Sequence, residues 1–166
     1  MNETSGDSPK ELILKAREKA LNLLSYSDKT EYLLREKLKE GDFPPSVIDD
    51  AIEYAKSFHY LDDLRYAENF IRSHRGTKSI REMKEKLREK GVSKEDLEAA
   101  FSTEETDEEE TVKQLFLKKY RTKVLSDPKV YEKAVRYFSA KGFSYEVIRR
   151  GVKSSIEELK NALEFN

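Results

Sequence analysis

Few residues in this sequence could carry out covalent chemistry. The 166 residues include two His and no Cys, so there is no thiol nucleophile and no cysteine ligand for zinc. Neither histidine has the spacing that would give a nucleophile a base and an orienting partner, and the phosphate-cradling and hydrolase motifs are absent. We therefore expect a protein that is not an enzyme and that needs no cofactor.

A histidine and two carboxylates, all potential metal ligands, come close together in the segment His59-Tyr60-Leu61-Asp62-Asp63. A metal site needs several ligands that converge, and this segment supplies only about one turn of chain. Capping of a helix by Asp62, with Asp63 near the positive end of the helix dipole, explains the acidic pair more simply. We expect no metal site.

Charge is distributed unevenly along the chain. The total is 32 Lys and Arg against 33 Asp and Glu, a net charge of −1. Residues 65–94 hold ten basic and four acidic residues (+6), residues 111–166 thirteen and six (+7), and residues 1–59 nine and twelve (−3). Clustered like charges repel one another unless something anionic binds there, so the two basic stretches predict an anionic partner.

The candidate binding residues are the basic side chains that cluster in these two stretches: Arg65, Arg72, Arg75, Lys78, Arg81, Lys84, Arg88, Arg136, Arg149, Arg150 and Lys153. For any one of them the alternative is a solvated helix surface with ion pairs such as Arg81–Glu85. Tyr120 and Tyr137 could stack on bases, or they could pack between helices.

The elements that position these residues are predicted to be helices, because apolar residues recur at helical spacing and no strand-like alternation is present. A first helix is expected over about 10–25. Asp28 with Glu31 resembles a capping box that opens a second helix, and Gly41 should end it. A third helix then starts near Pro45. Its expected buried face carries Ile48, Ala51, Ile52, Ala55 and Phe58.

The later helices have start and stop signals of the same kind. The expected N-terminal residues are Asp62, Ser79, Ser93, Asp127 (followed by Pro128) and Ser144. Gly91 and Gly142 are expected to end the helices before them.

The three-helix pattern occurs three times without gaps. With Leu38, Leu87 and Phe138 in register, the offsets are 49 and 51 residues. The matching apolar or small positions are Phe43, Val92 and Phe143; Ile48, Leu97 and Ile148; Ala51, Ala100 and Gly151; and Ile52, Phe101 and Val152. A match over a helix stop, a turn and the following helix face predicts a true triplication.

This periodicity predicts an all-α fold of three tandem three-helix repeats, each like a helix-turn-helix bundle, that stack into an elongated curved rod. The expected organisation is a disordered tail over 1–9, repeat 1 over 10–59, repeat 2 over 60–101, an acidic linker over 102–110 and repeat 3 over 111–166.

At the junction of repeats 1 and 2 the sequence resembles a known family. The segment Phe58-His59-Tyr60-Leu61-Asp62-Asp63-Leu64-Arg65-Tyr66-Ala67 is similar to the "G-Y-L-D-D-x-R-F-A" segment of the RecX family. The stretch 30–38 resembles its "S-x-x-E-L-x-x-K-L" phrase, and 87–92 its "L-x-x-K-G-I" phrase. The sequence departs from the family at two positions: His59 replaces the usual Gly, and Leu33 stands where Glu is expected.

The resemblance implies a negative regulator of the RecA recombinase, acting in DNA repair, homologous recombination and the SOS response. Its partners would be the RecA filament and the single-stranded DNA within it. The chain would lie in the filament groove and suppress strand exchange and ATP hydrolysis. With no apolar run long enough for a membrane span and no N-terminal signal-peptide pattern, we expect a cytoplasmic monomer.

Two alternatives come from other classes of protein. A tandem helix-turn-helix protein would read duplex DNA with the third helix of each repeat. Acidic residues such as Asp49, Asp50, Glu95 and Asp96 argue against this, because they would face phosphates. An α-solenoid scaffold for an unrelated protein is the second alternative.

The stacked-repeat prediction can be tested in solution. Small-angle X-ray scattering of the monomer should give an elongated particle, because each repeat contacts only its neighbours. A radius of gyration matching a compact sphere of this length, about 15 Å, would contradict the stacked arrangement.

Overall fold

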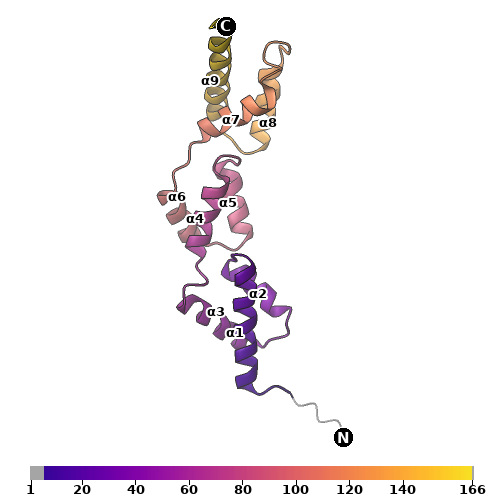
Figure 1. Ribbon diagram of the computed structural model, residues 1–166, viewed down its shortest axis with the longest axis vertical. Coiled ribbons are helices and arrows are strands. Elements are labelled where there is room, and N and C mark those ends of the chain that lie inside the picture. The colour runs from indigo at the N-terminus through magenta and orange to yellow at the C-terminus, as the bar shows by residue number, and fades with distance from the viewer. Residues whose placement is uncertain (1–5, 166) are drawn as a thin grey trace. The chain divides into compact units, whose positions relative to one another are not determined.

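The computed structural model describes residues 6–165, and this range contains nine α-helices and no strand. They are α1 (Pro9–Tyr26), α2 (Glu31–Lys39), α3 (Pro45–Ser57), α4 (Asp63–His74), α5 (Ile80–Glu89), α6 (Lys94–Thr103), α7 (Glu108–Tyr120), α8 (Val130–Ala140) and α9 (Tyr145–Glu164) (Figure 1). The all-α prediction is confirmed, with three helices in each predicted repeat.

The chain divides into two compact units, and the division passes through repeat 2. One unit holds the chain up to Ala67 together with Leu87–Ala100. The other holds Glu68–Lys86 together with the chain from Phe101 onward. Part of repeat 2 therefore belongs to the same compact unit as repeat 1, and the rest belongs to the same compact unit as repeat 3.

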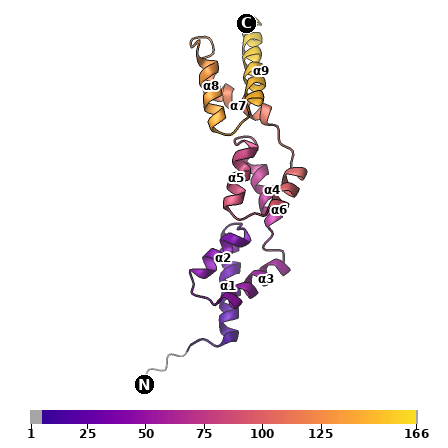
Figure 2. The same ribbon diagram turned by 180° about the vertical axis from the view of Figure 1, so that it is seen from behind.

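Repeat 1 is built around α1, which packs against both α2 and α3. Views from opposite sides both show α1 between these two helices (Figures 1 and 2). The predicted positions Leu38, Ile48, Ala51, Ile52 and Ala55 are all buried in its core, together with Ala16, Ala20 and Leu34. Phe58 is an exception, since its side chain is 54% exposed at the C-terminal end of α3.

Repeat 3 has a second core in which α9 packs on α7 and α8. Val112, Phe116, Phe138, Ile148 and Val152 are buried completely. The predicted small position has a clear reason here. A Cβ built on Gly151 would lie 2.9 Å from the Glu109 carbonyl oxygen and 2.9 Å from Val112 Cγ1, so α9 approaches α7 too closely for a larger residue.

Several helix starts differ from the prediction. Thr30, not Asp28, caps α2, and its hydroxyl accepts a hydrogen bond from the Leu33 amide. The predicted start at Asp127 is also wrong, because α8 begins at Val130. Asp127 instead accepts a hydrogen bond from the Lys129 amide and pairs with Lys133, which holds it in the turn before the helix.

Other predicted caps are confirmed. Asp62 accepts from the amide of Arg65, Ser79 from Glu82, Ser93 from Asp96 and Ser144 from Val147.

The irregular segments are shorter than predicted. In the predicted tail, residues 1–5 lie outside the described residues, whereas Ser8 forms a capping box with Glu11 and Pro9 begins α1. Within the predicted linker, α6 extends to Thr103 and α7 begins at Glu108. Acidic residues in the first turn of α7 favour this early start because they complement the helix dipole.

The turn between the second and third helix of every repeat contains a residue with positive φ. These residues are Asp42 (57°), Gly91 (84°) and Gly142 (93°), which occupy identical positions in the repeat register. Gly41, which was expected to end the second helix, follows the C-cap of α2 at Glu40, and the positive φ falls on the next residue, Asp42. Asp is among the residues that tolerate the left-handed conformation.

The turns of repeats 2 and 3 are hydrogen-bonded to the preceding repeat. The Thr30 hydroxyl donates to the Lys90 carbonyl oxygen at 2.5 Å, and the Ser79 hydroxyl donates to the Lys141 carbonyl oxygen at 2.7 Å. Thr30 and Ser79 are both fully buried. Each hydroxyl thus caps its own helix and binds the next repeat.

Beside each of these contacts, a carboxylate of the later repeat accepts a hydrogen bond from a backbone amide of the earlier repeat. Asp63 accepts from the Glu31 amide, and Glu108 accepts from the Ile80 amide, both at 2.8 Å. Each acid is the first residue of the next repeat's first helix. We call this two-part arrangement, one hydroxyl on a carbonyl and one carboxylate on an amide, the repeat joint.

The two ends of the array lack joint residues. Val130 stands in repeat 3 where Thr30 and Ser79 stand in the earlier repeats, so no hydroxyl is offered to a further turn. In repeat 1, Asp42 occupies the register position that Gly91 and Gly142 hold in repeats 2 and 3.

Glycine at position 91 is required for two reasons, and substitution tests them. A Cβ on Gly91 would lie 2.3 Å from Tyr32 Cβ. Left-handed backbone costs about 1–2 kcal/mol without glycine, and overpacking adds about 1–3 kcal/mol. We predict that Gly91→Ala lowers the free energy of unfolding by roughly 2–4 kcal/mol in urea denaturation.

The matched control is Gly76→Ala, where no atom lies within 4 Å of the new Cβ. This variant should change stability by less than about 1 kcal/mol. Equal losses in the two variants would contradict the packing argument.

Ion pairs in repeat 1 predict a dependence of stability on pH. Hydrogen bonds from Arg17 lower the pKa of Asp50. Burial alone would raise the pKa of Glu31, but hydrogen bonds from Lys56 and Arg35 leave it lowered. A lowered folded-state pKa stabilises the fold above the ordinary carboxyl range, and this stabilisation is lost as pH falls through the folded pKa.

Asp50→Asn should therefore cost roughly 0.5–1 kcal/mol at pH 7 and almost nothing at about pH 2. Denaturant titrations at both pH values measure the difference. The control is Glu18→Gln on α1, next to Arg17, which removes an exposed acid without an ion pair to any described residue. A pH-independent cost for Asp50→Asn would show that its ion pair is not responsible.

Candidate functional site

The predicted basic residues lie on α4, α5, α8 and α9 and, for Arg75 and Lys78, in the turn between α4 and α5. They fall into two groups, those with an ion pair and those without one. The difference matters because a cation already held by an acid is less available to an anionic partner than one that is free.

Arg72 and Arg75, near the C-terminal end of α4, are brought together by one acidic residue. Arg72 contacts Glu104 through two nitrogens, Nη2 to Oε1 at 2.5 Å and Nε to Oε2 at 3.4 Å. Arg75 Nη1 lies 3.8 Å from the same carboxylate and donates to the Glu105 carbonyl oxygen at 3.1 Å. The acidic segment after α6 therefore partly neutralises this pair of arginines.

The next cations, Lys78, Arg81 and Lys84, lie just before α5 and along it. Lys78 pairs with Glu82 and Arg81 with Glu85, each four residues apart. These two contacts match the alternative of a solvated helix surface. Lys84 Nζ lies 5.1 Å from the centre of the Phe101 ring, a cation–π contact that leaves its charge unneutralised.

Arg88 is exposed and has no ion pair with any described residue. In repeat 3, Arg149 and Arg150 share the carboxylate of Glu146. Arg136 on α8 and Lys153 on α9 are exposed and form no ion pair within residues 6–165. Lys84 and Arg65 also have no ion pair, but Lys84 contacts a ring and Arg65 a carbonyl oxygen. We call Arg88, Arg136 and Lys153 the free cations, because among the predicted residues only their side chains have no such contact with residues 6–165.

Arg65 has a structural contact, since its Nη1 donates to the His59 carbonyl oxygen at 2.8 Å. His59 has a positive φ of 58°. This backbone conformation explains why glycine is usual at that place in the family segment. Exposed aromatic rings flank it, with Phe58 stacked on Tyr60 at 5.9 Å between ring centres.

A cation–aromatic cluster in repeat 3 was not predicted. Lys119 Nζ and Lys141 Nζ lie 4.2 and 5.1 Å from the centre of the Tyr137 ring. Tyr137 also contacts Tyr120 and Phe138 edge to face, so it packs between helices as well as holding lysines. The repeat joint positions Lys141 because Ser79 binds its carbonyl oxygen.

The sequence carried one signal for this cluster, a lysine before the glycine of the repeated turn. It carried none for Lys119, whose position over Tyr137 depends on how α7 packs near α8.

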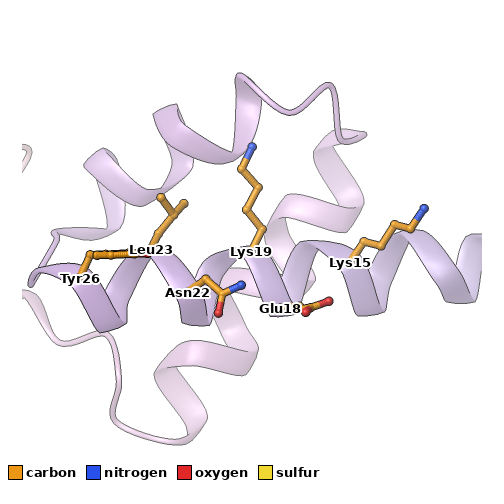
Figure 3. Close-up of a pocket in the computed structure, with 6 residues that line it drawn as sticks. All are labelled: Lys15, Glu18, Lys19, Asn22, Leu23 and Tyr26. Carbon is orange, nitrogen blue, oxygen red and sulfur yellow. The ribbon is translucent and has the colours of Figure 1, made fainter.

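A shallow groove on repeat 1 carries no comparable chemistry. It is lined by Lys15, Glu18, Lys19, Asn22, Leu23 and Tyr26. All six residues belong to α1, and their side chains do not converge on one point (Figure 3). Lys15 is paired with Asp7, and Lys19 lies near the Phe43 ring.

Neither a metal cluster nor a membrane span was found over residues 6–165. These residues contain no group of three or more acidic or His side chains placed to hold a metal ion. No helix among them combines the length and apolar character needed to cross a membrane.

Comparison with protein families gives three matches in chain order. Residues 16–54 match the model of the first three-helix domain of RecX, residues 62–100 the second and residues 107–152 the third. The predicted triplication therefore corresponds to three distinct family domains.

Curated relatives and solved structures agree with these matches. "Regulatory protein RecX" of Vibrio vulnificus is 36% identical over 138 residues, covering 82% of this chain and 90% of that protein. The protein of the same name from Clostridioides difficile is 32% identical over 144 residues, covering 84% and 68%. The crystal structure of RecX from Lactobacillus salivarius superposes with a TM-score of 0.77 at 25% identity, covering 88% and 97%.

Proposed function

The chain belongs to the RecX family of regulatory proteins, and on this premise we propose that it restrains the RecA recombinase by binding the RecA–single-stranded DNA filament. The resemblance of residues 58–67 to the family segment implies RecA as the partner. The observation that carries the proposal is the presence of exposed, unpaired cations in repeats 2 and 3, at Arg88, Arg136 and Lys153.

The mechanism uses the serial order of the repeats. Contacts from successive repeats to neighbouring recombinase subunits or to DNA would be linked within one chain. Linking raises the effective concentration of each further contact, so several weak contacts give firm binding. A regulator held in the filament groove in this way would block strand exchange and slow ATP turnover.

Electrostatics gives the two ends of the chain different roles. Repeat 1 has a net negative charge, and three of its nine cations, Arg17, Arg35 and Lys56, are bound to acids on other helices of the repeat. We propose that the free cations of repeats 2 and 3, with the Lys119–Tyr137–Lys141 cluster, face DNA phosphates or acidic recombinase surface. A contact to phosphates would give binding that weakens as salt rises.

The proposal requires no catalytic step by this chain. It acts as a monomeric binding protein in the bacterial cytoplasm, without a cofactor or a bound metal. Its effect on ATP hydrolysis is an effect on the filament.

A pair of substitutions tests the role of the free cations. Arg136→Gln with Lys153→Gln should raise the concentration that half-inhibits RecA ATPase by roughly three- to tenfold at low salt, because two phosphate or carboxylate contacts are lost. The slope of log affinity against log salt should fall by about 1.

The matched control is Lys37→Gln with Lys39→Gln, which removes the same charge from repeat 1, where both lysines are paired with glutamates. The control should change inhibition by less than about twofold. Equal effects of the two double variants would mean that overall charge, not the free cations, sets affinity.

A further inference from the structure

We propose that the acidic segment between α6 and α7 is an internal competitor for the filament: Glu104 occupies the guanidinium groups of Arg72 and Arg75, which an anionic partner must otherwise take. This inference rests on the proposed function and describes how two more of the basic residues of repeat 2 are regulated. The competing ligand is a phosphate of the single-stranded DNA.

The geometry of the contact is that of a bound anion. Arg72 presents Nη2 and Nε to the two oxygens of one carboxylate, and Arg75 approaches the second oxygen. This side-on fork is the arrangement in which arginine also binds phosphate. Glu104 therefore holds the donors that a phosphate would use, and the two anions cannot occupy them together.

The solvent exposure of the three side chains shows that a new anion can reach the arginines and replace Glu104. The Glu104 side chain is only 11% exposed, whereas Arg72 and Arg75 are 54% and 43% exposed. The arginines cover the glutamate while remaining open to solvent on their outer side. A phosphate can approach from that side and displace the carboxylate.

Because of its position in the chain, Glu104 can leave the arginines at a small cost in folding free energy. It lies in the four residues between the last residue of α6, Thr103, and the first of α7, Glu108. Ion pairs with partly exposed partners contribute little net stability, so displacement should not unfold either helix. A DNA backbone that contacts several cations at once can outcompete one carboxylate.

The neighbouring residue provides a matched control. Glu105 is exposed, its carboxylate forms no ion pair, and only its backbone carbonyl contacts Arg75. Glu104→Gln and Glu105→Gln remove the same charge from adjacent positions. Any difference between them therefore reports the contact with the arginines and not the local charge.

The experiment measures the affinity of the full chain for fluorescent oligo(dT) and for RecA–oligo(dT) filaments by anisotropy. Glu104→Gln should bind both about three- to tenfold more tightly than wild type at 50 mM salt, and Glu105→Gln within about twofold. The difference should shrink at high salt, where screening weakens the competing ion pair. Adding Arg72→Gln and Arg75→Gln to the Glu104→Gln chain should abolish the gain.

Circular dichroism melting separates competition from a structural role. If Glu104→Gln lowers the melting temperature, Glu104→Asp, which keeps the charge but shortens the reach, supplies a second variant with an expected intermediate gain. Affinities of Glu104→Gln and Glu104→Asp equal to or weaker than that of Glu105→Gln would overturn the inference and leave the proposed function standing. Failure of the wild-type chain to bind the filament would instead overturn the proposed function.

Discussion

The hydrogen bond from a buried helix-capping hydroxyl to the backbone of the next repeat is the contact on which the array depends. Thr30 and Ser79 each satisfy an amide of their own helix and a carbonyl of the following turn. That turn presents its carbonyl only because Gly91 or Gly142 adopts a left-handed backbone. A small domain of about 50 residues buries little surface alone, so each repeat gains stability from a neighbour. The joint also fixes Lys141, and through it the cluster around Tyr137.

Much of the fold could be predicted from sequence because burial follows helical periodicity. Leu38, Leu87 and Phe138 are fully buried at the places the repeat register assigns them. Prediction was weaker where two local signals compete. Asp28 and Thr30 are both good caps, and only the contact of Thr30 with the next repeat distinguishes them. Phe58 is apolar and in register, yet it lies at the last turn, where the helix leaves the core.

The candidate site was less predictable because a count of charges cannot show which charges are paired. Pairs four residues apart on one helix, such as Arg81–Glu85, can be anticipated from spacing. The partner of Arg72 is 32 residues away, so only the folded chain brings the two together. Basic stretches in the sequence therefore indicate where anionic partners could bind, whereas the free cations are known only once every ion pair has been assigned.

The uneven distribution of joint residues bears on how such arrays change length during evolution. Repeat 2 takes part in both joints: its glycine turn accepts the hydroxyl of Thr30 in the repeat before it, and its Ser79 hydroxyl donates to the turn of the repeat after it. Duplication of this middle segment would insert a unit compatible on both sides. A copy of repeat 3 would instead bring Val130, which has no hydroxyl, into an internal junction. A copy of repeat 1 would bring Asp42, whose Cβ would stand where a Cβ on Gly91 or Gly142 meets the preceding repeat. Growth of the gene from its centre is thus the route that the chemistry of the junction permits.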